Sequence, residues 1–258
     1  MKYFKFGENW KNYLKTLNSK KIKEAERSLK KMLNIDTLEQ KFFLDVGSGS
    51  GLFSLAARNL GAKVVSFDQD ELSVYCTNSL KKRFYPMDNN WKVIKGSVFN
   101  KEFLLTLGKF DYVYSWGVLH HTGNMWKALS NVVNCVKLDG TLFISIYNDQ
   151  GYVSRYWYFV KKNYNNYFIF RIFFILVHFL YPTFPSLVLR YFQKRKQYRG
   201  MNVWYDLLDW LGGYPFEVSS PEKIFDYYKN LGFKLVQLKT VGGKSGCNEF
   251  VFKRMKLK

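Results

Sequence analysis

The chain of 258 residues has few cysteines and, relative to its basic residues, few acids. Its three cysteines, Cys76, Cys135 and Cys247, are odd in number and widely spaced, and they form no CxxC or metal-binding pattern. Such a set is typical of free thiols in a reducing compartment. The N-terminal stretch MKYFKFGENWKNYLK also lacks an apolar signal core. We therefore expect a cytoplasmic protein.

The deficit of acids leaves a large positive charge. The sequence contains 20 Asp and Glu against 40 Lys and Arg, which gives a net charge of +20, and aromatic residues make up 19%. A surface with this charge attracts phosphate-bearing partners, either nucleic acid or an anionic membrane. A codon bias toward Lys, Asn, Phe and Tyr would raise the charge without selecting a partner. The totals leave both explanations open.

The sequence lacks an uninterrupted hydrophobic run of the length that a membrane-spanning helix requires, about 20 residues. The most apolar run, Ile172 to Leu189, approaches this length, but His178, Pro182 and Pro185 interrupt it. A span here would also place the last strands of the fold on the wrong side of the bilayer. We therefore expect segment 171–199 to form a helix, a proline break and a second short helix that ends in the basic run RYFQKRKQYR.

Most of the chain alternates between short apolar runs and helical patterns. Such alternation predicts a parallel sheet covered by helices on both faces, that is, a doubly wound α/β fold. The turn-like stretch VGGKSG before the last run predicts a closing hairpin. The predicted strands are 41–47, 63–68, 91–98, 110–116, 140–148 and 247–255, the predicted helices are 50–61, 71–82 and 124–137, and segment 220–240 is predicted to hold a Ser-capped helix followed by a strand.

A basic amphipathic helix is predicted before this pattern, over residues 19–33, with Ser19 as its N-cap. We expect it to dock on the α/β body. Its apolar face would comprise Ile22, Ala25, Leu29, Met32 and Leu33.

The stretch DVGSGSG (45–51) lies between a predicted strand and a predicted helix. Glycines there allow the backbone to approach a ligand closely, and the helix N-terminus favours polar or anionic groups. A phosphate-binding P-loop is excluded, because Leu52 and Phe53 stand where Lys and Ser or Thr are required. A dinucleotide fingerprint is also excluded, because Leu52 occupies the position of its third glycine.

The stretch FLDVGSGSGLFSLAA resembles motif I of the class I S-adenosylmethionine (SAM)-dependent methyltransferases. The resemblance implies a mostly parallel seven-stranded sheet with an antiparallel last strand. It also implies that Asp45 and the backbone of Gly47, Ser48, Gly49 and Gly51 hold the methionine moiety.

The same resemblance assigns Asp68, at the end of the second strand, to the two ribose hydroxyls. A carboxylate suits this role because it accepts two hydrogen bonds from a vicinal diol. Gln69, Ser97, Val98 and Trp116 complete the implied cofactor site. Many relatives carry an Asp where this chain has Ser97, which can still accept a hydrogen bond from the adenine amino group.

The methyl acceptor is expected beyond the carboxyl ends of the fourth and fifth strands. His120 and His121 lie there as candidate general bases, Tyr147 as an orienting group, and Asp209 as a base or an anchor among aromatic residues. The VLHH stretch resembles the branch that includes the ubiquinone- and menaquinone-biosynthesis methyltransferases. That branch implies a small-molecule or lipid-like acceptor.

The predicted organisation has three parts. Residues 1–40 form an N-terminal helical part, in which Trp10 and Tyr13 stand where the family that the chain resembles often places a flap over SAM. Residues 41–258 form the SAM-binding domain, and a helical, aromatic insertion at 150–219, after the fifth strand, interrupts it as a lid. The basic end of this insertion is expected to rest on anionic headgroups, which would make the protein peripherally membrane-associated.

The leading hypothesis is a SAM-dependent methyltransferase that acts on a lipophilic or aromatic small molecule by O- or C-methylation. The alternative enzyme is an RNA methyltransferase. The net charge favours it, and so does segment 190–199, in which basic and aromatic residues are mixed. A membrane-peripheral scaffold with a vestigial cofactor loop is the non-enzyme alternative.

Overall fold

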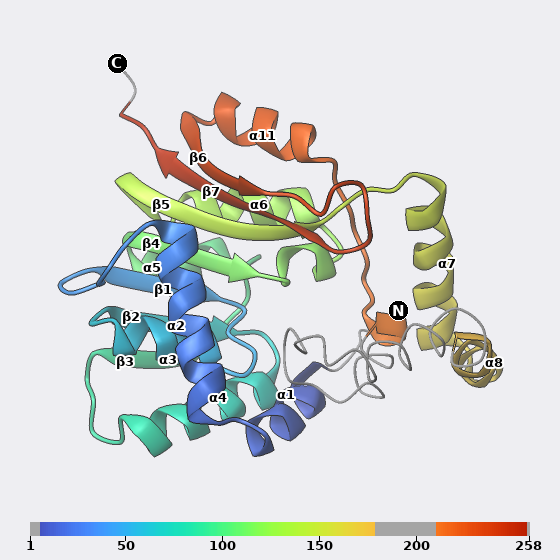
Figure 1. The fold of residues 1–258 in the computed structure, drawn as a ribbon, viewed down its shortest axis with the longest axis horizontal. Coiled ribbons are helices and arrows are strands. Elements are labelled where there is room, and N and C mark those ends of the chain that lie inside the picture. The colour runs from blue at the N-terminus through green and yellow to red at the C-terminus, as the bar shows by residue number, and fades with distance from the viewer. Residues whose placement is uncertain (1–5, 179–209, 257–258) are drawn as a thin grey trace.

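The computed structural model describes residues 6–178 and 210–256. Its strands are β1 (Phe42–Val46), β2 (Lys63–Asp68), β3 (Trp91–Lys95), β4 (Phe110–Trp116), β5 (Val136–Tyr147), β6 (Phe233–Lys239) and β7 (Cys247–Arg254). They form a seven-stranded sheet in the order β3-β2-β1-β4-β5-β7-β6 (Figure 1). Neighbouring strands from β3 to β5 pair in parallel, whereas β7 pairs antiparallel with both β5 and β6. The predicted mostly parallel seven-stranded sheet with an antiparallel last strand is therefore confirmed.

Helices cover both faces of the sheet. They are α1 (Phe6–Lys15), α2 (Ser19–Leu33), α3 (Leu52–Asn59), α4 (Glu71–Phe84), α5 (Lys101–Leu107), α6 (Met125–Val133), α7 (Tyr152–Asn166), α8 (Phe168–His178) and α11 (Pro221–Asn230). Side chains alternate across a strand, so Phe43 and Tyr114 pack against α2, α3 and α4, while their neighbours Leu44 and Val113 pack against α5, α6 and α11. The sheet is thus doubly wound, as predicted, and the three cysteines are free.

Asparagine side chains cap the N-termini of three of these helices, α2, α5 and α6. Asn18 is the N-cap of α2, because its backbone is extended and its Oδ1 accepts a 3.0 Å hydrogen bond from the N–H of Lys21. The prediction that Ser19 caps this helix is wrong, since Ser19 is already its first helical residue. Asn100 caps α5 in the same way, by accepting from the N–H of Phe103. The sequence pattern missed α5, because two turns are too short to display a periodic apolar face.

β5 is longer than predicted. The predicted helix at 124–137 ends at Val133, and the strand predicted at 140–148 begins at Val136. Asp139 has a positive φ of 58°, and the pairing of β4 with β5 shifts register between Phe110 and Tyr112. Such an irregularity breaks the two-residue alternation that marks a strand. The sequence pattern therefore did not identify the first residues of β5.

The insertion predicted at 150–219 begins with α7 and α8. Both helices lie beyond the carboxyl ends of the parallel strands, and α8 covers the start of the apolar segment 171–199 (Figure 1). The predicted proline break, second short helix and basic run lie outside the described residues, and so does Asp209. Among the helices that the structure describes, none is long and apolar enough to cross a membrane.

Candidate active site

Three glycines form the loop between β1 and α3. Gly47, Gly49 and Gly51 have positive φ values of 76°, 54° and 78°, which favour glycine. A Cβ atom at Gly51 would lie 2.9 Å from the Cα of Thr77, and one at Gly47 would lie 2.4 Å from Cγ1 of Val118. The loop therefore brings bare backbone to the carboxyl end of β1, the edge where ligands of open α/β sheets bind.

Asp68 ends β2 beside this loop. Its Oδ2 accepts a 3.0 Å hydrogen bond from the N–H of Gly49, and its Oδ1 accepts a 2.9 Å hydrogen bond from the N–H of Asp70. Burial raises the pKa of Asp68 to about 6, although these backbone donors oppose the rise. Each carboxylate oxygen can accept a second hydrogen bond. The carboxylate is thus fixed at the loop and keeps acceptor capacity for a vicinal diol.

Asp45 lies on β1, just before the glycine loop, and accepts the last of a series of buried hydrogen bonds. Nε1 of Trp91 donates to Oγ of Ser66 at 2.9 Å, and Oγ of Ser54 donates to Oδ2 of Asp45 at 2.5 Å. The two serine hydroxyl oxygens are 2.7 Å apart. Because the Ser54 proton points to Asp45, the Ser66 hydroxyl donates to Ser54. The hydrogen bonds therefore all donate in one direction, from β3, through β2 and α3, to Asp45 on β1.

The environment of Asp45 favours its neutral form. No side chain of the hydrogen-bond chain is more than 2% exposed. Burial raises the pKa of Asp45 to about 7, the hydrogen bond from Ser54 opposes the rise, and the charge of Asp68 adds to it. The carboxyl group is thus bonded into the protein interior, and its predicted contact with the methionine moiety stays a prediction. Sequence reasoning missed Ser54, Ser66 and Trp91, because isolated serines in apolar runs carry no spacing signature.

Four further residues of the predicted cofactor site lie along the same edge. Oγ of Ser48 is 2.9 Å from Oγ1 of Thr77, which fixes the loop to α4. Oγ of Ser97 donates a 3.2 Å hydrogen bond to Oε1 of Gln69, so the ends of β2 and β3 are joined. The side chain of Val98 is buried in the hydrophobic core. The structure thus brings Gln69 and Ser97 together and gives Val98 a packing role, while their cofactor contacts stay predictions.

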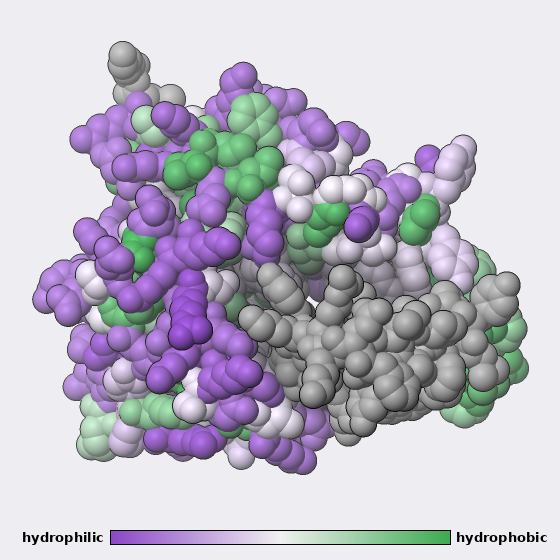
Figure 2. Space-filling model, viewed as in Figure 1, coloured by the Kyte–Doolittle hydropathy of each residue, from purple (hydrophilic) through white to green (hydrophobic). Residues whose placement is uncertain are grey.

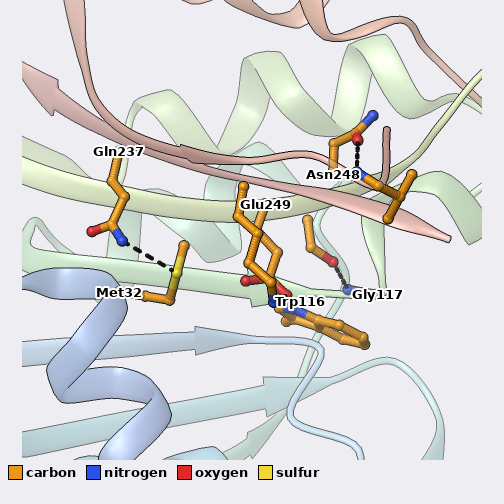
Figure 3. Close-up of polar contacts among 9 residues, drawn as sticks. Met32, Trp116, Gly117, Gln237, Asn248 and Glu249 are labelled. Carbon is orange, nitrogen blue, oxygen red and sulfur yellow. Dashed lines mark hydrogen bonds and ion pairs between the residues drawn. The ribbon is translucent and has the colours of Figure 1, made fainter. Parts of the chain in front are cut away.

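Trp116 ends β4, which β5 separates from β7 in the sheet. Its Nε1 donates a 3.3 Å hydrogen bond to Oε1 of Glu249, and the same oxygen accepts a 3.0 Å hydrogen bond from Nζ of Lys239. Figure 3 shows Glu249 reaching from β7 toward the indole ring. Glu249 is buried, and sequence reasoning missed it. It orients the ring of Trp116, whose predicted cofactor contact remains a prediction.

Two histidines follow β4 in the short 3₁₀ helix η1 (Leu119–His121). The ring centroid of the buried His120 lies 4.0 Å from that of Tyr147, at the end of β5, and that of His121 lies 5.4 Å from it. The structure therefore brings together three of the four predicted catalytic residues, His120, His121 and Tyr147. The fourth, Asp209, is not among the described residues.

His121 is held as a neutral imidazole. Its Nδ1 lies 2.6 Å from the carbonyl oxygen of Pro215, and because a carbonyl only accepts, Nδ1 carries the proton and Nε2 is the acceptor. Burial, together with the positive charge of Lys161, lowers the pKa of His121 to about 3, although the hydrogen bond to Pro215 opposes the change. A group with so low a pKa is a weak base at neutral pH, which suits orientation better than proton removal.

Residues of the insertion close the other side of Tyr147. The ring centroids of Trp210 and Phe216 lie 5.7 Å and 5.3 Å from that of Tyr147. Nζ of the buried Lys161 donates a hydrogen bond to the carbonyl of Trp210 and lies 4.3 Å from the centroid of its ring. Sequence reasoning missed Lys161, because its role depends on the return of the chain at residue 210. Tyr147 is therefore surrounded by aromatic rings, and the buried Lys161 lies next to one of them, that of Trp210.

The helix α1 lies across the same edge of the sheet. A Cβ atom on Gly7 would lie 2.2 Å from Oδ2 of Asp70, so α1 approaches the start of α4 closely. A Cβ atom on Gly49 would lie 2.9 Å from Nε1 of Trp10, which places this indole ring against the glycine loop. The ring centroid of Tyr13 lies 6.2 Å from that of Trp10. The two aromatic residues singled out in the sequence thus pack together, and Trp10 borders the loop.

The methyltransferase domain family matches residues 17–237 of this chain. The chain belongs to this family. The sequence-based identification of a methyltransferase is therefore confirmed, whereas the ubiquinone- and menaquinone-type branch is not.

Comparisons of sequence and of structure agree with the family. This methyltransferase is 38% identical over 125 residues to ribosomal protein L11 methyltransferase of Prochlorococcus marinus (strain MIT 9312), and the match covers 47% of this chain and 40% of that relative. A SAM-bound magnesium protoporphyrin IX methyltransferase from Synechocystis PCC 6803 has a TM-score of 0.55 at 12% identity, over 90% of this chain and 79% of the other.

A second solved structure covers more of both chains. A SAM-dependent methyltransferase from Aquifex aeolicus has a TM-score of 0.54 at 15% identity, over 95% of this chain and 98% of that one. At such identities the structural likenesses show the fold. The curated relatives are matched over less than half of their length, so they leave the acceptor open.

Proposed function

We propose that this methyltransferase transfers a methyl group from SAM to a lipophilic or aromatic small molecule, by O- or C-methylation. The observation that carries the proposal is the glycine loop after β1, whose Gly49 N–H is bonded to Asp68 at the end of β2. The family membership of the chain supports it, and so does a structural neighbour of the same fold that was crystallised with SAM.

The residues at this edge fit SAM. The ribose of SAM carries a vicinal diol, and the fixed carboxylate of Asp68 keeps acceptor capacity beyond its backbone hydrogen bonds. The amino-acid part of SAM requires backbone at close range, which the positive φ of Gly47 and Gly49 provides. Gln69 and Ser97, joined at the ends of β2 and β3, are proposed to contact the nucleoside.

The acceptor is proposed to lie against Tyr147 and the histidines of η1. Bound SAM supplies an electrophilic methyl group, so the protein must chiefly align the acceptor and exclude water. Nε2 of His121 is the accepting atom of a neutral ring, suited to orient an acceptor hydroxyl. Phe216 and Trp210 surround Tyr147 with aromatic carbon, which favours an apolar acceptor.

A protein acceptor is the second candidate, because the curated relatives are ribosomal protein L11 methyltransferases by name. An RNA acceptor is the third, because the net charge of +20 favours contact with phosphates.

One experiment separates the three acceptor classes. Purified protein is incubated with SAM that carries a radiolabelled methyl group and with extract of cells that lack the gene. We expect the label in the organic-solvent extract, in a product heavier than its precursor by one CH₂ unit. If ribonuclease or protease releases the label instead, the methyl acceptor is RNA or protein, respectively, and the small-molecule proposal is wrong.

The role of Tyr147 is tested in the same assay. We expect Tyr147→Phe and His121→Asn to reduce transfer while SAM affinity stays unchanged, because both residues are proposed to contact the acceptor. A loss of SAM affinity in these variants would contradict that placement.

A further inference from the structure

The helices α7 and α8 expose an unusually apolar surface. On α8, four side chains follow helical spacing on one face, namely Ile169, Ile172, Phe173 and Leu176, and they are 80%, 47%, 52% and 53% exposed. Figure 2 shows hydrophobic side chains gathered at the edge of the molecule where α8 lies. Scattered exposed apolar residues are ordinary, but a contiguous patch of this kind marks an interaction surface.

The neighbouring helix α7 extends this surface with aromatic residues. Tyr152, Tyr156 and Phe159 are 84%, 48% and 53% exposed and are spaced for one helical face. The two helices pack on each other through the rings of Phe159 and Phe174, and Tyr156 is hydrogen-bonded to Nε2 of His178. The exposed residues are thus carried by a fixed pair of helices.

The charged side chains of α7 and α8 are all basic. Arg155, Lys162 and Arg171 are exposed on the two helices, and each cation lies over a tyrosine ring. The sequence contains no Asp or Glu between Asp149 and Asp206. An apolar patch carried by helices whose own charged side chains are cations complements a surface that combines hydrocarbon with negative charge.

We propose that the exposed face of α7 and α8 docks on an anionic membrane surface, with the α8 side chains at the level of the acyl chains and the cations at the headgroups. The helix α8 has 11 residues and is about 16 Å long, half of a hydrocarbon core, so it lies in the interface and does not span it. Tyrosine side chains, such as Tyr152 and Tyr156, are suited to this depth because they have an apolar body and a polar tip.

The composition of the α8 face favours lipid over nucleic acid. Three of its four side chains, Ile169, Ile172 and Leu176, are aliphatic. Single-stranded nucleic acid binds through stacking of bases on aromatic rings, for which aliphatic side chains provide no partner. Acyl chains accept both kinds of side chain.

Vesicle co-sedimentation of the full chain tests the docking surface without SAM or acceptor. Vesicles consist of phosphatidylcholine, with or without phosphatidylglycerol. We expect binding only to the anionic vesicles, and at least about tenfold weaker binding for the variant Ile169→Glu/Phe173→Glu. The matched control Leu105→Glu/Val236→Glu changes two equally exposed residues elsewhere and should bind as the native chain does.

A second pair of variants separates local charge from net charge. Arg155→Gln/Lys162→Gln/Arg171→Gln removes three cations from the surface, whereas Lys92→Gln/Lys234→Gln/Lys253→Gln removes three exposed cations elsewhere. The first is expected to lose vesicle binding and the second to keep it. Equal losses in both, or unchanged binding of the Glu variant, would overturn the proposal.

Two other outcomes also overturn it. One is a dimer in analytical ultracentrifugation that the Glu variant abolishes, with no vesicle binding, because the face would then cover a second copy of this chain. The other is binding to RNA that the Glu variant removes, again with no vesicle binding. SAM affinity, measured on the same variants, should be unchanged, so a failure here is distinct from a failure of the proposed methyl transfer.

Discussion

The backbone N–H of Gly49 donates a 3.0 Å hydrogen bond to Oδ2 of Asp68, which ties the loop after β1 to the end of β2. Gly49 follows β1 and Asp68 ends β2, and the carboxyl ends of these two adjacent parallel strands meet at one edge of the sheet. The hydrogen bond fixes the orientation of the carboxylate and the path of the loop together. The proposed SAM site therefore needs the carboxylate and the loop together, because each holds the other in place.

The first prediction concerns Gly51. Gly51→Ala adds a Cβ atom 2.9 Å from the backbone of Thr77 at a φ of 78°, so the loop must shift. We expect SAM affinity to fall at least about tenfold, since close backbone contact tolerates little displacement. Gly108→Ala is the matched control, because Gly108 has a φ of 80° and nothing within 4 Å of an added Cβ atom. Equal affinities of the two variants in a SAM titration would contradict the steric argument.

The second prediction concerns the buried hydrogen-bond chain. Ser54→Ala removes the donor to Asp45 and the acceptor of Ser66, and it leaves both groups buried without these partners. We expect the free energy of unfolding to fall by about 2–3 kcal/mol in urea denaturation. Ser79→Ala is the control, because its hydroxyl bonds only the carbonyl of Tyr75 on an exposed helix surface and should cost less than about 0.5 kcal/mol.

The third prediction concerns the pH dependence of stability. Because burial raises the pKa of Asp45 from 3.8 to about 7, the folded chain holds this proton more tightly than the unfolded chain. Its contribution to stability is present at low pH and is lost as the pH rises through about 7. Asparagine mimics the neutral carboxyl group. We therefore expect Asp45→Asn to gain about 2–4 kcal/mol relative to the native chain between pH 5 and pH 8. A stability difference that is the same at both pH values would show that Asp45 is ionised throughout.

The fourth prediction concerns the pH dependence of SAM binding. Asp68 is proposed to bind the ribose, and a carboxylate accepts hydrogen bonds more strongly than a neutral carboxyl group does; burial raises the pKa of Asp68 to about 6. SAM affinity should therefore rise about tenfold between pH 5 and pH 7.5. In Asp68→Asn this part of the rise should disappear. A native profile that is flat over this range would contradict the role of Asp68.

The positions of the strands along the chain and the place of the cofactor loop were predictable from the sequence, because both depend on local signals. The alternation of apolar runs with helical patterns located six of the strands, and the glycines of DVGSGSG located the loop. Asp68 was identifiable because it ends the next strand, and parallel strands bring their carboxyl ends together.

The remaining parts of the site depend on contacts between distant residues, which carry no local signal. The series of hydrogen bonds from Trp91 to Asp45 joins three strands and a helix. Glu249 is bonded to Trp116, although the two residues are 133 positions apart in the sequence. His121 appeared to be a candidate base from its identity alone. Only the structure shows that Pro215 and burial hold it neutral, with a pKa of about 3.

The central claim is that this edge of the sheet binds SAM through Asp68, and calorimetric titration with SAM tests it most directly. The native chain should bind SAM, and Asp68→Ala should bind it at least about tenfold more weakly, since two hydrogen bonds to a charged group are lost. Asp226→Ala, which removes an exposed carboxyl group on α11, is the control and should bind as the native chain does. Absence of binding by the native chain, or equal affinity in Asp68→Ala, would contradict the claim.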